Sequence, residues 1–265
     1  IDHPFNIHPI GTGPYKFVEA EVKNGQILGL TLEANEGYFL GAPFIQDLVI
    51  RYYDDGDSAF RAYQAGEVDG VSRIDLDVLP DALAQTDLNL YSMPEPRLNM
   101  VFLNLKNIET PFFQDSFVRK ALMMAVNRRA IIDQQLQGQA VLAEGPIMPG
   151  NWAFYSEQGS YSFDPEAARQ LLLNHGMTQD EDGLMHTAEG IALQFELLHA
   201  EGELETKIAQ SIQENWAAIG VQVELQGLAF DQLLGRLAAH DYDAAFTELD
   251  LSGTPDPDPY PFWGQ

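Results

Sequence analysis

Alternating apolar and polar residues predict that the first third of the chain forms mainly β-strands. The alternation is clearest over residues 45–52, and similar patterns cover residues 15–20 and 28–34. Asn24 and Gly25 lie between the last two segments. This dipeptide favours the tight turn of a β-hairpin, so we expect the two segments to pair in antiparallel fashion.

A helix and a domain boundary are predicted next. The helix covers residues 58–65 and ends at Gly66, because glycine readily adopts the left-handed conformation found after a helix. Residues 68–71 are predicted to form a short buried strand. Several prolines then interrupt the chain and indicate a boundary. We place it after residue 97, which divides the chain into segments 1–97 and 98–265.

The second segment mixes helices with strands. Its clearest helix is predicted to follow the N-cap Asp115 and to continue to about Leu136, with one apolar stripe at steps of three, four and seven residues. Such a mixture predicts an α/β fold with a partly antiparallel sheet. The other predicted elements are strands over 99–105, 193–197 and 221–225 and helices over 165–176, 205–219 and 231–239.

Composition excludes several classes of protein. The 265 residues include 40 acidic and 14 basic side chains, for a net charge of −26, and 45% of the residues are hydrophobic. The apolar fraction is typical of a globular protein. The negative charge disfavours binding to nucleic acids and to anionic membrane surfaces. The absence of Cys excludes disulfides, thiolate zinc sites and a Cys nucleophile.

A search for reactive motifs predicts no enzyme. The sequence contains none of the common hydrolase, zinc-protease or P-loop signatures. The Gly11-Thr12-Gly13 segment lacks the third glycine of a dinucleotide-binding loop and is predicted to be a tight turn. Acidic segments 54–57 and 180–183 lack the ligand spacing of an EF-hand and are predicted to be solvated turns. No catalytic residue, cofactor or metal ligand is assigned.

Both ends of the chain resemble internal positions of a longer protein. The sequence begins at Ile1 without the features of a signal peptide, and it ends in an aromatic stretch. Residues 255–263, which include much of this stretch, alternate proline with acidic and aromatic residues. This pattern predicts a stiff extended loop. Its aromatic side chains are expected to pack in a core or to line a cleft.

Several short motifs follow one another in a recognisable order, and together they span nearly the whole chain. The motifs lie at residues 11–17, 62–69, 102–104, 111–128, 138–140, 145–149, 164–172, 219–221, 240–243 and 255–263. They resemble those of the bacterial extracellular solute-binding proteins of family 5, the peptide- and nickel-binding receptors of ABC importers. Asn127 stands where the family usually has Asp.

The resemblance implies a fold and a function. The fold would be α/β and two-lobed, like the periplasmic binding proteins of type II, class C, with mixed sheets that are incomplete in a fragment. Residues 1–97 would belong to the first lobe and residues 98–265 to the opposite lobe. The protein would be an extracytoplasmic monomer, periplasmic or a cell-surface lipoprotein. It would capture a peptide or other small solute between the lobes and deliver it to an ABC-type permease.

The resemblance also implies where the solute binds. Asp250, Leu251, Ser252 and Gly253 would line the cleft. In peptide-binding members an Asp near this loop pairs with the α-ammonium of the peptide, but the matching position here is Gly253. Asp250 could substitute for the missing carboxylate, and otherwise the ligand would be a different solute.

Arg97 and Asn99 lie where the chain is expected to cross between the lobes, and they would either reach the ligand or brace the hinge. Arg119 resembles an arginine on a family helix, and we assign it a structural role.

Two alternative functions remain open. One is a receptor for a metal or metal chelate, suggested by six scattered His residues, and the other is a hydrolase with an acid pair.

Overall fold

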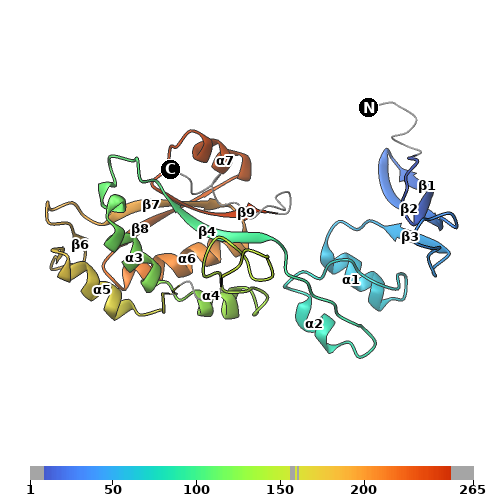
Figure 1. Ribbon diagram of the computed structural model, residues 1–265, viewed down its shortest axis with the longest axis horizontal. Coiled ribbons are helices and arrows are strands. Elements are labelled where there is room, and N and C mark those ends of the chain that lie inside the picture. The colour runs from blue at the N-terminus through green and yellow to red at the C-terminus, as the bar shows by residue number, and fades with distance from the viewer. Residues whose placement is uncertain (1–8, 156–158, 160, 252–265) are drawn as a thin grey trace. The chain divides into compact units, whose positions relative to one another are not determined.

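The computed structural model describes residues 9–155, 159 and 161–251, and its chain divides into two compact units that meet between Tyr91 and Ser92 (Figure 1). Each unit has a sheet of its own. The division lies six residues before the boundary expected from the prolines. The two units are described separately below.

The first unit contains the predicted strands. They form an antiparallel sheet in the order β1-β2-β3. Asn24 and Gly25 both have positive φ, at 53° and 80°, as the tight turn of a two-residue hairpin requires. The hairpin prediction is therefore confirmed. The strands are β1 (Tyr15–Lys23), β2 (Gln26–Ala34) and β3 (Asp47–Arg51).

Two short helices follow this sheet. Helix α1 (Gly56–Gln64) is capped by Asp55, whose carboxylate accepts a hydrogen bond from the Ser58 backbone N–H at 2.7 Å. Helix α2 (Leu79–Ala84) was not predicted. The prediction treats Pro80 as an interruption of the chain, but proline is well tolerated in a first helical turn. A small core of Phe60, Val78 and Ala82 lies between them.

One predicted strand of this unit is wrong. Residues 68–71 form no strand, and Asp69 and Gly70 are exposed. The segment contains only two apolar residues around an Asp-Gly pair, which favours a turn. No described strand of the first unit pairs with it.

The second unit is built on a mixed sheet in the order β4-β9-β7-β8 (Figure 1). Strand β9 is antiparallel to β4 and parallel to β7, and β7 is parallel to β8. This confirms the predicted partly antiparallel sheet, although β9 itself was not predicted. The strands are β4 (Arg97–Leu103), β7 (Gln194–Ala200), β8 (Gln222–Leu228) and β9 (Ala244–Asp250).

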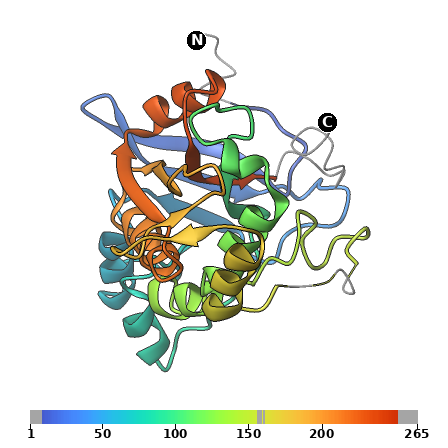
Figure 2. The same ribbon diagram turned by 90° about the vertical axis from the view of Figure 1, so that its left-hand side faces the viewer.

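Helices cover both faces of this sheet, as Figure 1 and Figure 2 show. On one face, a large core includes Phe113, Leu197 and Trp216, and the Trp216 indole N–H donates to the Leu122 carbonyl at 2.9 Å. On the other face, Leu233 of α7 packs with buried Leu198. The remaining elements are η2 (Pro111–Gln114), α3 (Ser116–Ala125), α4 (Arg128–Gln135), α5 (Pro165–Asn174), β5 (Thr178–Gln179), β6 (Met185–His186), α6 (Glu203–Ala217) and α7 (Phe230–Ala238).

The long helix predicted over 115–136 is in fact two helices, α3 and α4. The chain leaves the helical conformation at Val126, where ψ is 119°. The Asn127 backbone N–H donates to Asn215 Oδ1 at 2.6 Å, and the Asn127 side chain accepts from the Ala130 N–H at 3.0 Å. Asn127 therefore follows the end of α3 and caps the start of α4.

The strand predicted over 99–105 is also displaced. Strand β4 covers Arg97–Leu103, so that Leu105 lies beyond it and is 43% exposed.

Among the described residues, none of the helices is long and apolar enough to cross a membrane.

Candidate functional site

Four of the six residues expected to contact a solute come together at one end of the β4–β9 pair. Arg97 lies opposite Asp250 in the antiparallel register, and Asn99 lies opposite Glu248. The Leu251 backbone N–H donates to the Pro96 carbonyl at 2.8 Å, which continues the pairing past the last residue of β9. The other two predicted residues, Ser252 and Gly253, lie outside the described residues.

The side chains at this end form an exposed polar surface. Alternate residues of a strand share one face, so Arg97, Asn99 and Val101 point the same way, and so do Phe246 and Glu248 on β9. Val101 and Phe246 pack into the large core under the helices. Beyond them the same face of the two strands becomes polar and exposed. We call this surface, made by Glu95, Arg97, Asn99, Glu248 and Asp250, the polar end of β4–β9.

Ion pairs hold the Arg97 guanidinium across this surface. Its Nε lies 3.1 Å from Glu95 Oε2, and its Nη1 lies 3.1 Å from Glu248 Oε1. Exposed pairs of this kind contribute little to stability. Their effect is to orient the guanidinium beside the carboxylates.

The polar end combines two kinds of hydrogen-bonding group. The surface has three carboxylates, two of them paired with the Arg97 guanidinium, which leaves an excess of negative charge. Carboxylates accept hydrogen bonds and attract cations, whereas the guanidinium and the Asn99 amide can donate. Such a surface can recognise a polar solute that carries N–H or ammonium groups. No group of three or more His, Asp or Glu residues in the described parts of the chain could hold a metal ion.

Two members of this surface were missed from the sequence. Glu95 lies in the proline-rich stretch before β4, and Glu248 lies in the unpredicted strand β9. A signal for Glu248 was present, because Phe246, Glu248 and Asp250 alternate with Thr247 and Leu249. That alternation indicates a strand whose one face becomes acidic toward its end.

Other residues singled out from the sequence have structural roles. The Arg119 guanidinium donates to the carbonyls of Phe113 and Gln114, which agrees with the structural role assigned to it. Asp180 accepts hydrogen bonds from the backbone of its own turn. Residues 11–13 lead directly into β1 rather than into a helix, as a tight turn does. The Pro-rich segment 255–263 lies outside the described residues.

Comparison with known proteins identifies the family of this chain. The family model "Bacterial extracellular solute-binding proteins, family 5 Middle" matches residues 2–264. The chain is 29% identical over 254 residues to the oligopeptide-binding protein AppA of Bacillus subtilis, and this match covers 94% of the chain but 45% of AppA. It is 29% identical over 217 residues to heme-binding protein A of Haemophilus influenzae, and this match covers 81% of the chain and 37% of that protein.

Solved structures show the same fold. The structure of NikZ from Campylobacter jejuni in complex with Ni(L-His) superimposes with a TM-score of 0.65 at 26% sequence identity, and the match covers 93% of this chain and 47% of NikZ. The chain thus spans less than half the length of the relatives described here. AppA and heme-binding protein A are named as binding proteins. The family match over almost all of its length shows that this chain belongs to the bacterial extracellular solute-binding proteins, family 5.

Proposed function

We propose that this chain is part of an extracytoplasmic receptor that captures a small solute and delivers it to an ABC-type importer. The family match over residues 2–264 is the observation on which the proposal rests. The receptor binds and releases its solute and catalyses no reaction. Binding and closure are coupled, because a solute that prefers the closed form shifts the protein toward it.

The polar end of β4–β9 is the proposed solute-contacting surface of this chain. Residues 1–97 are proposed to belong to the first lobe and residues 98–265 to the opposite lobe. Arg97 and Asn99 then lie where the chain passes from one lobe to the other, and Asp250 and Leu251 lie at the end of the strand that faces the solute. The pairing of Arg97 with Asp250 and of Asn99 with Glu248 supports only the grouping of these residues at one surface.

A peptide is the first solute class that we propose. The relative AppA is named an oligopeptide-binding protein. Gly253 provides no carboxylate for a peptide ammonium, but Asp250 and Glu248 supply carboxylates on the neighbouring strand. A charge-assisted hydrogen bond from an ammonium group to one of these carboxylates would replace the missing one.

A thermal-shift screen of the complete protein tests the proposal. Dipeptides, oligopeptides, oligosaccharides and nickel chelates are added in turn, and a true ligand at a hundred times its Kd adds about 2.7 kcal/mol of stability. Glu248→Gln and Asp250→Asn should each weaken a solute that carries an ammonium group. Glu224→Gln is the matched control, because Glu224 is an exposed carboxylate on β8, the opposite edge of the same sheet. A screen without any shift contradicts the receptor function.

A metal chelate is the second candidate solute. NikZ, whose structure contains Ni(L-His), has the same fold at 26% identity. The Arg97 guanidinium could pair with the carboxylates of a chelating ligand, as guanidinium groups commonly do. A shift with nickel–histidine that is absent with nickel alone and with histidine alone would favour this solute over a peptide. Turnover of any solute in the screen would instead favour the hydrolase alternative.

A further inference from the structure

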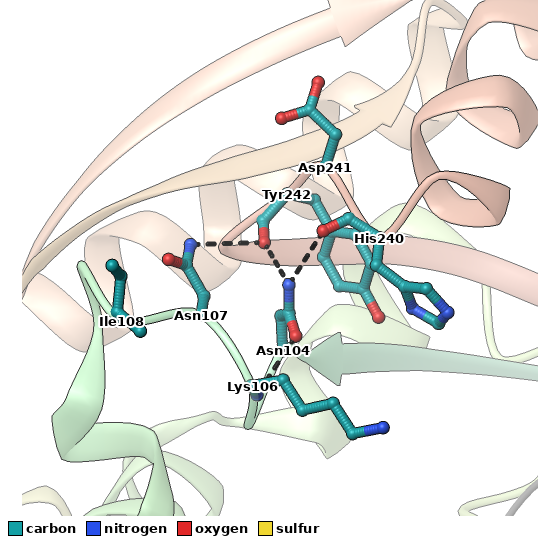
Figure 3. A pocket seen from close by; sticks show the side chains of 7 residues that line it. All are labelled: Asn104, Lys106, Asn107, Ile108, His240, Asp241 and Tyr242. Atoms are coloured by element: carbon teal, nitrogen blue, oxygen red, sulfur yellow. Dashed lines mark hydrogen bonds between the residues drawn. The ribbon is translucent and has the colours of Figure 1, made fainter.

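A second concave site lies at the other end of the β4–β9 pair. It is a pocket of about 310 Å³ between the segment that follows β4 and the segment that precedes β9. Strands rise about 3.3 Å per residue, so the length of β4 separates this pocket from the polar end by about 20 Å. The pocket is lined by Asn104, Lys106, Asn107, Ile108, His240, Asp241 and Tyr242 (Figure 3).

Two asparagines hold the walls of the pocket in place. The Asn104 side-chain N–H₂ donates to the carbonyls of His240 and Tyr242, at 3.1 and 2.9 Å. Asn104 Oδ1 accepts from the Lys106 backbone N–H at 3.2 Å. Asn107 donates to Asp243 Oδ1 at 2.5 Å. These bonds tie the two segments together, so the pocket is formed before any ligand arrives.

His240 adopts a left-handed backbone conformation that glycine takes after three other described helices, and Gln137 takes it after α4, with φ of 50°. Helices α1, α5 and α6 are each followed by a glycine of positive φ, namely Gly66, Gly176 and Gly220. Helix α7 ends with the same pair of backbone hydrogen bonds, from the N–H groups of His240 and Asp241, but His240 has φ of 54°. A side chain in this conformation costs stability that glycine would not. The imidazole therefore stands at a position where glycine would be more stable.

Three side chains of the pocket are available as hydrogen-bond donors. Lys106, His240 and Tyr242 make no side-chain hydrogen bond or ion pair with the described part of the chain. Figure 3 shows their polar ends directed to the same side of the pocket. Burial raises the pKa of Tyr242, so its hydroxyl keeps its proton and can donate at neutral pH.

The one carboxylate in the lining is turned away from these donors. In Figure 3 the Asp241 side chain points upward, away from the three donors. Its Oδ2 lies 2.8 Å from Arg236 Nε, and this ion pair offsets its charge. The donors thus face the pocket without a competing carboxylate, although the chain as a whole has a net charge of −26.

We propose that this pocket binds the oxygen atoms of a small anion, a carboxylate or phosphate group contacted by Lys106, His240 and Tyr242. An ammonium and an imidazole can form charge-assisted hydrogen bonds with such a group, and the Tyr242 hydroxyl adds a third donor. A volume near 300 Å³ suits a molecule of metabolite size. The site is separate from the polar end of β4–β9 and does not depend on the proposed receptor function.

Calorimetric titration of the complete protein with inorganic phosphate and with succinate tests this site. Sodium chloride at equal ionic strength is the reference, because screening alone affects a protein of this charge. We expect saturable binding of at least one anion and no binding of chloride. Lys106→Gln and His240→Gly should each weaken it about tenfold or more, since the first removes an ammonium donor and the second an imidazole N–H donor. Lys23→Gln, which removes an exposed cation from β1, should leave the affinity unchanged.

His240→Gly also distinguishes loss of a ligand contact from loss of structure. Glycine suits the positive φ at this position, so the variant should unfold at the same temperature as the parent protein or higher. Weaker anion binding in a protein that is no less stable supports a direct contact. Binding of phosphate alone or of succinate alone identifies the anion class. No saturable binding of either anion, or equal affinities in all three variants, overturns the proposal, whatever the result of the solute screen.

Discussion

The sheet of the second unit and the sheet of the first unit differ in what covers their apolar side chains. In the second unit, Leu197 and Leu198 at the centre of β7 have no exposed surface, because helices pack on both faces. In the first unit, Leu30 on the central strand is only half-buried, and Val49, which pairs with Thr31 from β3, is 58% exposed. No residue of that sheet belongs to a cluster of buried side chains among the described residues.

This difference shows that strands can pair regularly without a buried core beneath them. Both sheets have strands with strong apolar character and regular backbone pairing. Burial of apolar surface supplies most of the free energy of folding, at about 25 cal/mol per Å². The second unit therefore has its own source of stability, whereas the first sheet leaves much of its apolar surface in water.

Matched leucine truncations give the largest test of this comparison. Leu197→Ala should cost about 2–5 kcal/mol of unfolding free energy, because it leaves a cavity between packed helices. Leu30→Ala should cost clearly less, since its side chain is already partly solvated. Urea unfolding of the 265-residue chain measures both. Equal costs at the two positions would contradict the comparison and would mean that the face of the first sheet is covered.

The sequence predicted the elements that depend on neighbouring residues. Asn24-Gly25 identifies the hairpin by local turn chemistry, and Asp115 and Asp164 identify helix starts by capping. Some failures, such as the strand predicted over 68–71, have local causes, and others depend on distant contacts. The break between α3 and α4 depends on Asn215, which lies 88 residues beyond Asn127. No local pattern contains that contact.

The candidate site shows the same limit. Resemblance to the family indicated Arg97, Asn99 and Asp250, but only the register of β4 against β9 places them opposite one another and adds Glu248. Arg97 and Glu248 are 151 residues apart in the sequence, so their pairing is a property of the tertiary fold. The second pocket was not predicted at all, because its two walls come from distant segments, with Asn104 and His240 136 residues apart.

The next largest effect tests the polar bond inside the core of the second unit. Trp216→Phe removes the indole N–H that donates to the Leu122 carbonyl and leaves that carbonyl without its partner in the core. We expect a loss of about 1–3 kcal/mol, from an unsatisfied buried acceptor and a smaller ring. Urea unfolding of this variant beside Trp152→Phe provides a control, since Trp152 is 83% exposed. A similar loss for both variants would contradict the assigned role.

A smaller effect is expected at the junction of α3 and α4. Asn127→Ala removes the cap of α4 and should cost about 1 kcal/mol, whereas Asn127→Asp keeps the cap and restores the residue usual in the family. Thermal unfolding of the two variants provides the measurement. A loss in the Asp variant as large as in the Ala variant would show that capping is not the role of this side chain.

The smallest effect concerns the first unit, where α1 has little core and depends on its ends. Hydrogen bonds from the Ser58 side chain and backbone, with the charge of Arg61, lower the pKa of Asp55 below its ordinary value of about 3.9. Because folding lowers this pKa, the stabilisation is complete when the pH is above the pKa of Asp55 in the unfolded chain. It is lost as the pH falls through the lower pKa of Asp55 in the folded protein. Amide hydrogen exchange in α1 should therefore become faster, relative to the unfolded chain, as the pH falls below about 3.9.

Asp55→Asn separates capping from charge in this helix. Asparagine caps helices as well as aspartate does but does not titrate, so the variant should lose much of the acid sensitivity of α1 while keeping the helix at neutral pH. The core of the second unit provides the internal reference, because amides of α6 should respond equally in both proteins. If α1 of the Asp55→Asn variant responds to acid to the same extent as α1 of the parent protein, the sensitivity comes from other carboxylates, and the first unit depends on its helix ends less than the comparison implies.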